Sequence, residues 1–90
     1  MKETIESIKN TLEKVKGVSG LAAGLSDDAD IIHGVGLDSL QMLRFMLELE
    51  ERLEVTIDFD RLEYSYFNSI RTLAEFMDGM PQRQSRTGAK

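Results

Sequence analysis

Apolar side chains recur along the first sixteen residues at the spacing of an α-helix. Successive members are separated by three, four and three positions, so they form one stripe, and charged residues occupy the remaining surface. The members of the stripe are Ile5, Ile8, Leu12 and Val15. This pattern predicts a helix over residues 3–16 that Gly17 ends.

A second helical pattern follows Asp38 and Ser39, one of which should cap its first turn. The segment runs from Leu40 to Glu54 and is rich in Leu, Met, Glu and Arg. On a helical wheel it shows one broad apolar arc, which we expect to face the core. The residues of that arc are Met42, Leu43, Phe45, Met46, Leu49 and Leu53.

A last helix is predicted to begin near Asn68 and Ser69 and to stop at Gly79, before Pro81. Its inward residues are expected to be Ile70, Leu73, Ala74, Phe76 and Met77. The segment 81–90 is polar and basic, and its composition predicts a disordered tail. Residues 1–80 should therefore form the folded domain.

The two connections between these helices differ in length. A long, turn-rich loop reaches from Gly17 to Asp38, and four apolar side chains could attach it to the core. These are Leu21, Leu25, Ile31 and Ile32. The segment 55–59 alternates like a strand but has no partner strand, so we predict an extended connector with Val55, Ile57 and Phe59 turned inward. A short helical turn over residues 60–64 completes an all-α four-helix bundle with three longer helices and one short one.

Size and charge narrow the possible functions. Ninety residues form one small domain, and the absence of cysteine excludes disulfides and thiolate catalysis. The net charge is −5, and because Arg83, Arg86 and Lys90 add three positive charges to a tail without acids, residues 1–80 carry −8. Such a body disfavours nucleic-acid binding and membrane insertion and favours partners with basic patches. We expect a monomeric, cytoplasmic protein, since no signal peptide or membrane span is visible.

The stretch Gly36-Leu37-Asp38-Ser39-Leu40 lies where the long loop meets the second helix. It resembles the phosphopantetheine attachment motif of the acyl carrier protein family, and the similarity extends from about residue 31 to residue 77. The resemblance implies that Ser39 carries a covalent 4'-phosphopantetheine arm, which a separate phosphopantetheinyl transferase delivers from coenzyme A. It also implies that Asp38 takes part in recognition and metal positioning there, while Gly36 permits a tight turn and Leu40 completes the motif.

The outer face of the second helix is a candidate docking surface for partner enzymes. Its members are Leu40, Arg44, Leu47, Glu48 and Glu51. Related fatty-acid carriers tend to have acidic residues at the positions of Gln41 and Arg44, so the charge near the arm is changed here. Either this change redirects the carrier to a dedicated ligase, ketosynthase or acyltransferase, or it is drift on a tolerant surface.

Other chemistry fits the sequence less well. A calcium loop counted from Asp28 would place His33 where glycine is needed, so we expect no metal site. A hydrolase built from Ser39, His33 and Asp38 would lack an oxyanion hole, and we expect no catalysis by the chain itself. Three functions stay open: an acyl carrier, a carrier of aminoacyl, peptidyl or aryl groups, and a helical interaction module that is never modified.

Overall fold

Three long helices form the framework of the structure, a computed structural model that describes residues 1–81. They are α1 (Lys2–Lys16), α3 (Ser39–Leu53) and α4 (Ile70–Asp78). Three shorter segments join them: α2 (Leu21–Gly24), the π-helical turn η1 (Ile31–Val35) and the 3-10 turn η2 (Tyr64–Phe67). No β-strand occurs in this part of the chain. The predicted all-α class and the three long helices are confirmed, with boundaries within two residues of those expected.

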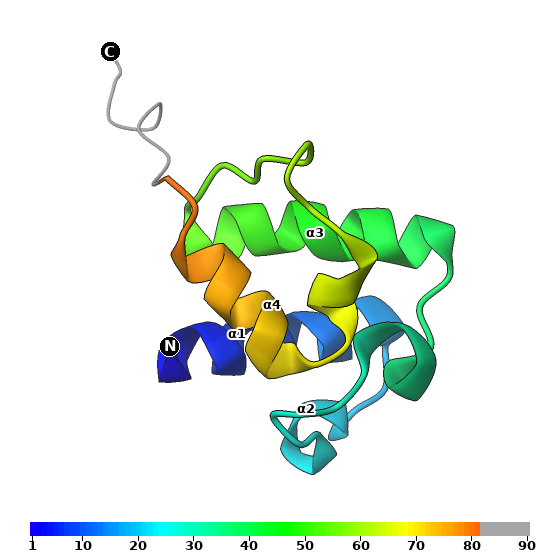
Figure 1. Ribbon diagram of the computed structural model, residues 1–90. Helices are drawn as coiled ribbons and strands as arrows, with labels where there is room; N and C mark the ends of the chain where they lie inside the picture. Colours follow the sequence, from blue (N-terminus) through cyan, green and yellow to red (C-terminus); the bar gives the residue numbers. More distant parts are fainter. Residues whose placement is uncertain (82–90) are drawn as a thin grey trace.

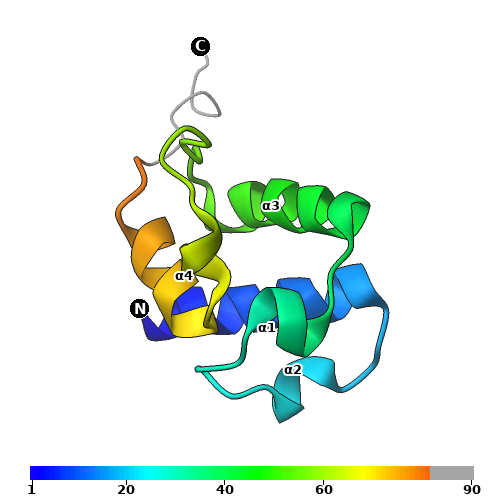
Figure 2. The ribbon, with the colours of Figure 1, turned by 45° about the vertical axis from the view of Figure 1, so that its right-hand side comes forward.

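The helices α1 and α3 lie side by side and run in opposite directions, and α4 packs against α1 near its N-terminus (Figures 1 and 2). The stripe predicted for α1 is buried throughout, and the inward residues predicted for α4 are buried as well. From α3, Phe45, Met46 and Leu49 enter this core. Burial of these apolar surfaces supplies the main driving force for the fold.

The long connection between α1 and α3 contains α2 and η1, which the sequence analysis did not predict. Ile31 of η1 is completely buried, and Leu21, Leu25 and Ile32 pack against the core from its edge. The expectation that these four side chains attach the loop is therefore confirmed.

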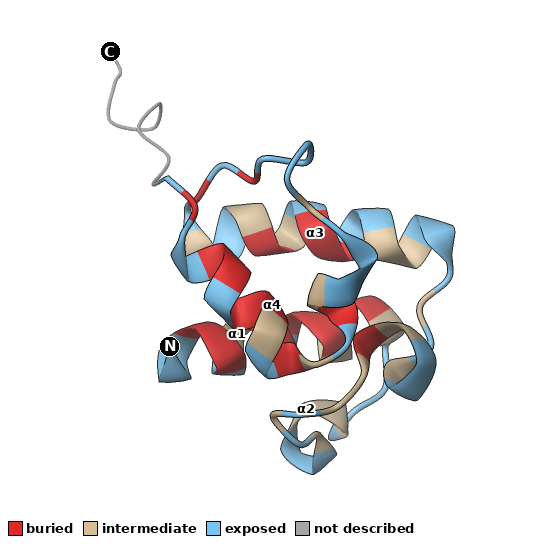
Figure 3. Cartoon of the chain, viewed as in Figure 1, coloured by how far each residue is buried: buried red, intermediate tan, exposed pale blue. Residues whose placement is uncertain are grey.

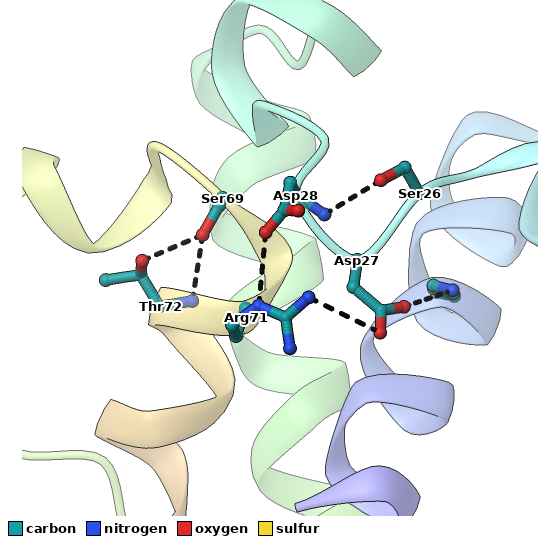
Figure 4. Close-up of polar contacts among 7 residues, drawn as sticks. Ser26, Asp27, Asp28, Ser69, Arg71 and Thr72 are labelled. Atoms are coloured by element: carbon teal, nitrogen blue, oxygen red, sulfur yellow. Dashed lines mark hydrogen bonds and ion pairs between the residues drawn. The ribbon is translucent and has the colours of Figure 1, made fainter.

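Ion pairs link the first half of this loop to α1 and α4 (Figure 4). The Asp27 carboxylate lies 2.7 Å from Lys9 Nζ of α1 and 3.9 Å from Arg71 Nη2 of α4, and Asp28 accepts from Arg71 Nε at 3.1 Å. The hydrogen bond from Lys9 lowers the pKa of Asp27, and the hydrogen bond to Asp28 raises the pKa of Arg71. Ser69 caps α4 in the same region by accepting a hydrogen bond from the Thr72 amide at 3.0 Å.

Two predictions for the connection between α3 and α4 are wrong in part. Val55 and Ile57 are buried as expected, but Phe59 is 49% exposed. Asp58 explains this difference: its carbonyl accepts from the Arg61 amide and its carboxylate from the Asp60 amide, and the resulting turn directs Phe59 outward. The short helix lies at residues 64–67 instead of 60–64, because this turn occupies the segment where we expected it.

The end of the described chain is attached to the same connection. The Thr56 amide donates to the Pro81 carbonyl at 3.0 Å, so the first residue of the predicted tail contacts the folded domain. The remainder of that tail, residues 82–90, lies outside the described residues. None of the helices in residues 1–81 has the length and apolar character that a bilayer span requires.

Candidate functional site

Ser39 is the first residue of α3, and Asp38 is the N-cap. The Asp38 carboxylate accepts from the Gln41 amide at 2.8 Å, and the Gln41 side chain accepts from the Asp38 amide at 3.1 Å. Together these bonds form a capping box, which fixes where the helix begins. Gln41, one of the two departures noted in the sequence, thus has a structural role at this end of the helix.

The backbone turns into this helix at Gly36, whose φ of 83° lies in the left-handed region. Glycine is favoured there because it has no Cβ to clash with the backbone, which confirms the tight turn expected at this position. The Gly36 carbonyl accepts from Lys16 Nζ at 2.7 Å, a contact that the sequence did not reveal. Leu37 packs against the edge of the core, whereas Ser39 is exposed.

A hollow of about 210 Å³ lies directly beside Ser39. Its walls are Ile32, Leu37, Asp38, Ser39, Met42 and Tyr64. A second hollow, of about 310 Å³, shares Ile32 and Tyr64 with the first and continues to Asp30, His33 and Asn68. The two hollows therefore adjoin and lead from Ser39 along the space between η1 and η2.

The aromatic residues before α4 have different roles. Tyr66 stacks on Phe76 with ring centroids 4.6 Å apart, and Phe67 is buried, so these two residues pack with the core. Tyr64 is 81% exposed and borders both hollows. Sequence reasoning missed these hollows because their walls come from segments about thirty residues apart.

The outer face of α3 carries the docking residues predicted from the sequence. Leu40, Arg44, Leu47 and Glu51 are exposed, while Glu48 is partly covered and lies 3.1 Å from Lys14 Nζ. One prediction for this helix is wrong, because Leu43 faces solvent instead of the core. The predicted apolar arc was too broad: α1 is the long helix that packs along α3, and the residues buried against the core occupy a narrower arc (Figure 3).

Comparison with protein families supplies the deciding observation. Residues 6–77 match the family described as the phosphopantetheine attachment site, and this match covers most of the chain. The chain belongs to the phosphopantetheine attachment site family. Comparisons with curated proteins and with solved structures gave no match.

Membership in this family makes the chain a carrier protein with covalently bound 4'-phosphopantetheine as its cofactor, and it implies a phosphopantetheinyl transferase and further enzymes as partners. When bound, the cofactor supplies a thiol that holds cargo as a thioester. The residues around Ser39 fit such a group. The amides of Ser39 and Leu40 at the tip of α3 form no hydrogen bond within residues 1–81, and a phosphodiester is favoured beside such groups.

Other candidate residues in this carrier protein are engaged elsewhere. Asp27 and Asp28, which were considered for calcium, form ion pairs with Lys9 and Arg71. Within residues 1–81 no three acidic or histidine side chains gather into a metal-binding group. The His33 amide donates to Asp30 Oδ1 at 2.7 Å, and its side chain borders the second hollow.

Proposed function

We propose that this protein is an acyl carrier protein and that Ser39 is the residue that bears the 4'-phosphopantetheine arm. The observation that carries the proposal is the exposed Ser39 at the first turn of α3, next to a hollow whose walls include the apolar side chains of Ile32, Leu37 and Met42. No group in the described residues forms a hydrogen bond with the Ser39 hydroxyl. It is thus accessible to a transferase that brings its own base and Mg²⁺, as expected of a substrate.

The walls beside Ser39 also bear on the cargo. Ile32, Leu37 and Met42 present apolar surface within reach of an arm on Ser39, which supports an alkyl or related acyl chain. Asp30, His33 and Asn68 in the second hollow offer polar groups that would suit the alternative, an aminoacyl or peptidyl cargo, but most of the wall of that hollow is apolar as well. Since apolar surface predominates in both hollows, we place the acyl carrier first.

The outer face of α3 completes the proposal. Enzymes that act on the arm must approach Ser39, and Leu40, Arg44, Leu47, Glu48 and Glu51 lie along the helix that begins there. We assign these residues to docking of the transferase and of an acyl-loading ligase, ketosynthase or acyltransferase. The predictions of a monomer and of a cytoplasmic location stay predictions.

The attachment test is the intact mass of the protein before and after incubation with coenzyme A, Mg²⁺ and a broad-specificity phosphopantetheinyl transferase. Wild-type protein should gain about 340 Da, the mass of the arm. Ser39→Ala should gain nothing, whereas Ser19→Ala, a change at another exposed serine, should gain the full mass. Absence of a gain in wild-type protein with several transferases would leave the unmodified interaction module as the better reading.

A second experiment separates the cargo classes. The same transferase attaches octanoyl-phosphopantetheine or alanyl-phosphopantetheine, and the rate of thioester cleavage by hydroxylamine is measured for each product. If the hollow beside Ser39 holds an acyl chain, the octanoyl thioester is cleaved more slowly than octanoyl-pantetheine in solution, and Met42→Gln removes this protection. Protection of the alanyl thioester alone would favour the aminoacyl carrier.

A further inference from the structure

Three leucines of α3 face solvent in one strip. Leu40 is 67% exposed, Leu43 53% and Leu47 49%. At about 100° per residue they fall within about 60° of the helix circumference, and they span about 10 Å along its axis. An isolated exposed leucine is ordinary, but three aligned leucines beside Ser39 form a continuous apolar surface that water solvates poorly.

A positive charge borders this strip at the end near Ser39. Arg44 is exposed, lies one turn after Leu40, and forms no ion pair within residues 1–81. The next acidic residue on this side, Glu48, is 3.1 Å from Lys14 Nζ, so its charge is largely compensated. Asp38 is the acidic residue nearest Ser39 in sequence. Its carboxylate keeps its negative charge, but it accepts the Gln41 amide in the helix cap and forms no ion pair with Arg44.

Arg44 therefore places an unpaired positive charge on a protein whose overall charge is negative. With a net charge of −5, the protein attracts positively charged partners over long distances. At contact distance Arg44 favours a partner of the opposite charge. A lysine or arginine placed against it would be repelled and would lose its water, whereas a carboxylate would form an ion pair with it. An enzyme that reaches Ser39 along α3 must cover Arg44, about 7.5 Å further along the helix.

We propose that Leu40, Leu43, Leu47 and Arg44 form a docking surface for an enzyme whose carrier-binding face has an apolar hollow bordered by an aspartate or glutamate. The inference rests on the proposed function, since it takes Ser39 as the point that the enzyme must reach. It adds the chemistry of the partner: leucines supply contact area, and the unpaired guanidinium selects a carboxylate over an amine.

The test uses two forms of one phosphopantetheinyl transferase: a parent with lysines or arginines on its carrier-binding face, and a variant with these residues changed to glutamate. The measured quantity is kcat/KM for attachment of the arm to Ser39, which is followed by the gain in protein mass. Arg44→Glu should raise this value about tenfold with the basic parent and lower it about tenfold with the acidic variant. The matched control is Arg61→Glu, the same charge change in the exposed connection after α3, which should change each value in the same direction as Arg44→Glu but by much less.

If Arg44→Glu gives the same values as Arg61→Glu with both transferases, Arg44 does not select charge and the inference is wrong. If wild-type protein gains no mass with either transferase, the proposed function fails, and this inference fails with it. Circular dichroism of each variant confirms the fold, which changes at these exposed arginines should leave intact.

A second measurement distinguishes an enzyme from another copy of this chain as the occupant of the strip. Light scattering at increasing protein concentration should give the monomer mass for wild-type protein and for Leu43→Gln. With the transferases, Leu43→Gln should lower kcat/KM several-fold, because a polar amide replaces apolar contact area. A wild-type dimer that Leu43→Gln dissociates would overturn the inference by showing that a second copy covers the strip.

Discussion

The two halves of the connection between α1 and α3 are held in different ways. In the first half, Asp27 and Ala29 accept backbone hydrogen bonds from Arg71 and Ile70 of α4, at 2.8 and 3.1 Å, and Asp27 pairs with Lys9. In the second half, the hydrogen bond from Lys16 to the Gly36 carbonyl connects this part of the chain to α1.

The first half of the connection therefore contributes to the stability of the fold, whereas the second half leaves Ser39 accessible to a partner enzyme. The first half crosslinks α1 and α4, so its side chains are engaged with the body of the protein. The second half leaves Ser39 exposed and fixes it mainly through local bonds within the capping box. A residue that a transferase must reach and modify requires such freedom, because every contact with its own chain would have to be broken first.

The largest expected effect comes from the buried anchor between these halves. Ile31 is completely buried, and Ile31→Ala should lower the free energy of unfolding by about 2–4 kcal/mol, through lost burial and the cavity left behind. Leu37→Ala, in the second half and only partly buried, should cost about 1 kcal/mol. Urea denaturation followed by circular dichroism measures both, and equal losses would contradict the division between the halves.

A smaller effect is expected at the turn before Ser39. Gly36→Ala should cost about 1–2 kcal/mol, because alanine is strained at a φ of 83° although no atom lies within 4 Å of its Cβ. It should also slow arm attachment, since relief of the strain would shift the start of α3. Gly34→Ala is the matched control: its Cβ meets Asp30 Cβ at an ordinary 3.6 Å, and we expect a change within about 0.5 kcal/mol. The same denaturation and mass measurements apply, and equal costs would rule out a special role for Gly36.

The smallest effect concerns pH and the Asp27 ion pair. Because the pKa of Asp27 in the folded state is below its ordinary value of 3.8, its carboxylate adds stability above that pH, and this stability is lost as the pH falls through the lowered pKa. The free energy of unfolding should therefore decline less steeply between about pH 5 and pH 2 in Asp27→Asn than in wild-type protein. Asp60→Asn, at a carboxylate without an ion pair in residues 1–81, should keep the wild-type slope, and a wild-type slope in Asp27→Asn would refute the prediction.

The parts of the fold that the sequence predicted are those governed by local rules. Period and capping located α1, α3 and α4, since each buries a stripe at helical spacing and residues such as Asp38, Ser69 and Gly17 mark the ends. The outward position of Leu43 was missed because a helical wheel gives the direction of a side chain but not the width of the neighbour that covers it.

The same distinction holds for the candidate site, where local sequence predicts one part and contacts between distant residues form the other. The position of Ser39 at the start of a helix follows from five consecutive residues, so the motif was sufficient to predict it. The hollow beside it depends on Ile32 and Tyr64, which no local pattern connects. The contact between Lys16 and Gly36 likewise joins residues twenty positions apart.

The burial of α3 has a geometric consequence for the attachment residue. Met42 packs against the core only in part, and the fully buried residues begin at Phe45, six positions after Ser39, so about 9 Å of helix extends beyond the first fully buried residue. A tilt of α3 by about 6° around Phe45 would displace Ser39 by about 1 Å. The positional accuracy of the hydroxyl is thus set remotely, by how tightly Phe45, Met46 and Leu49 fit their neighbours.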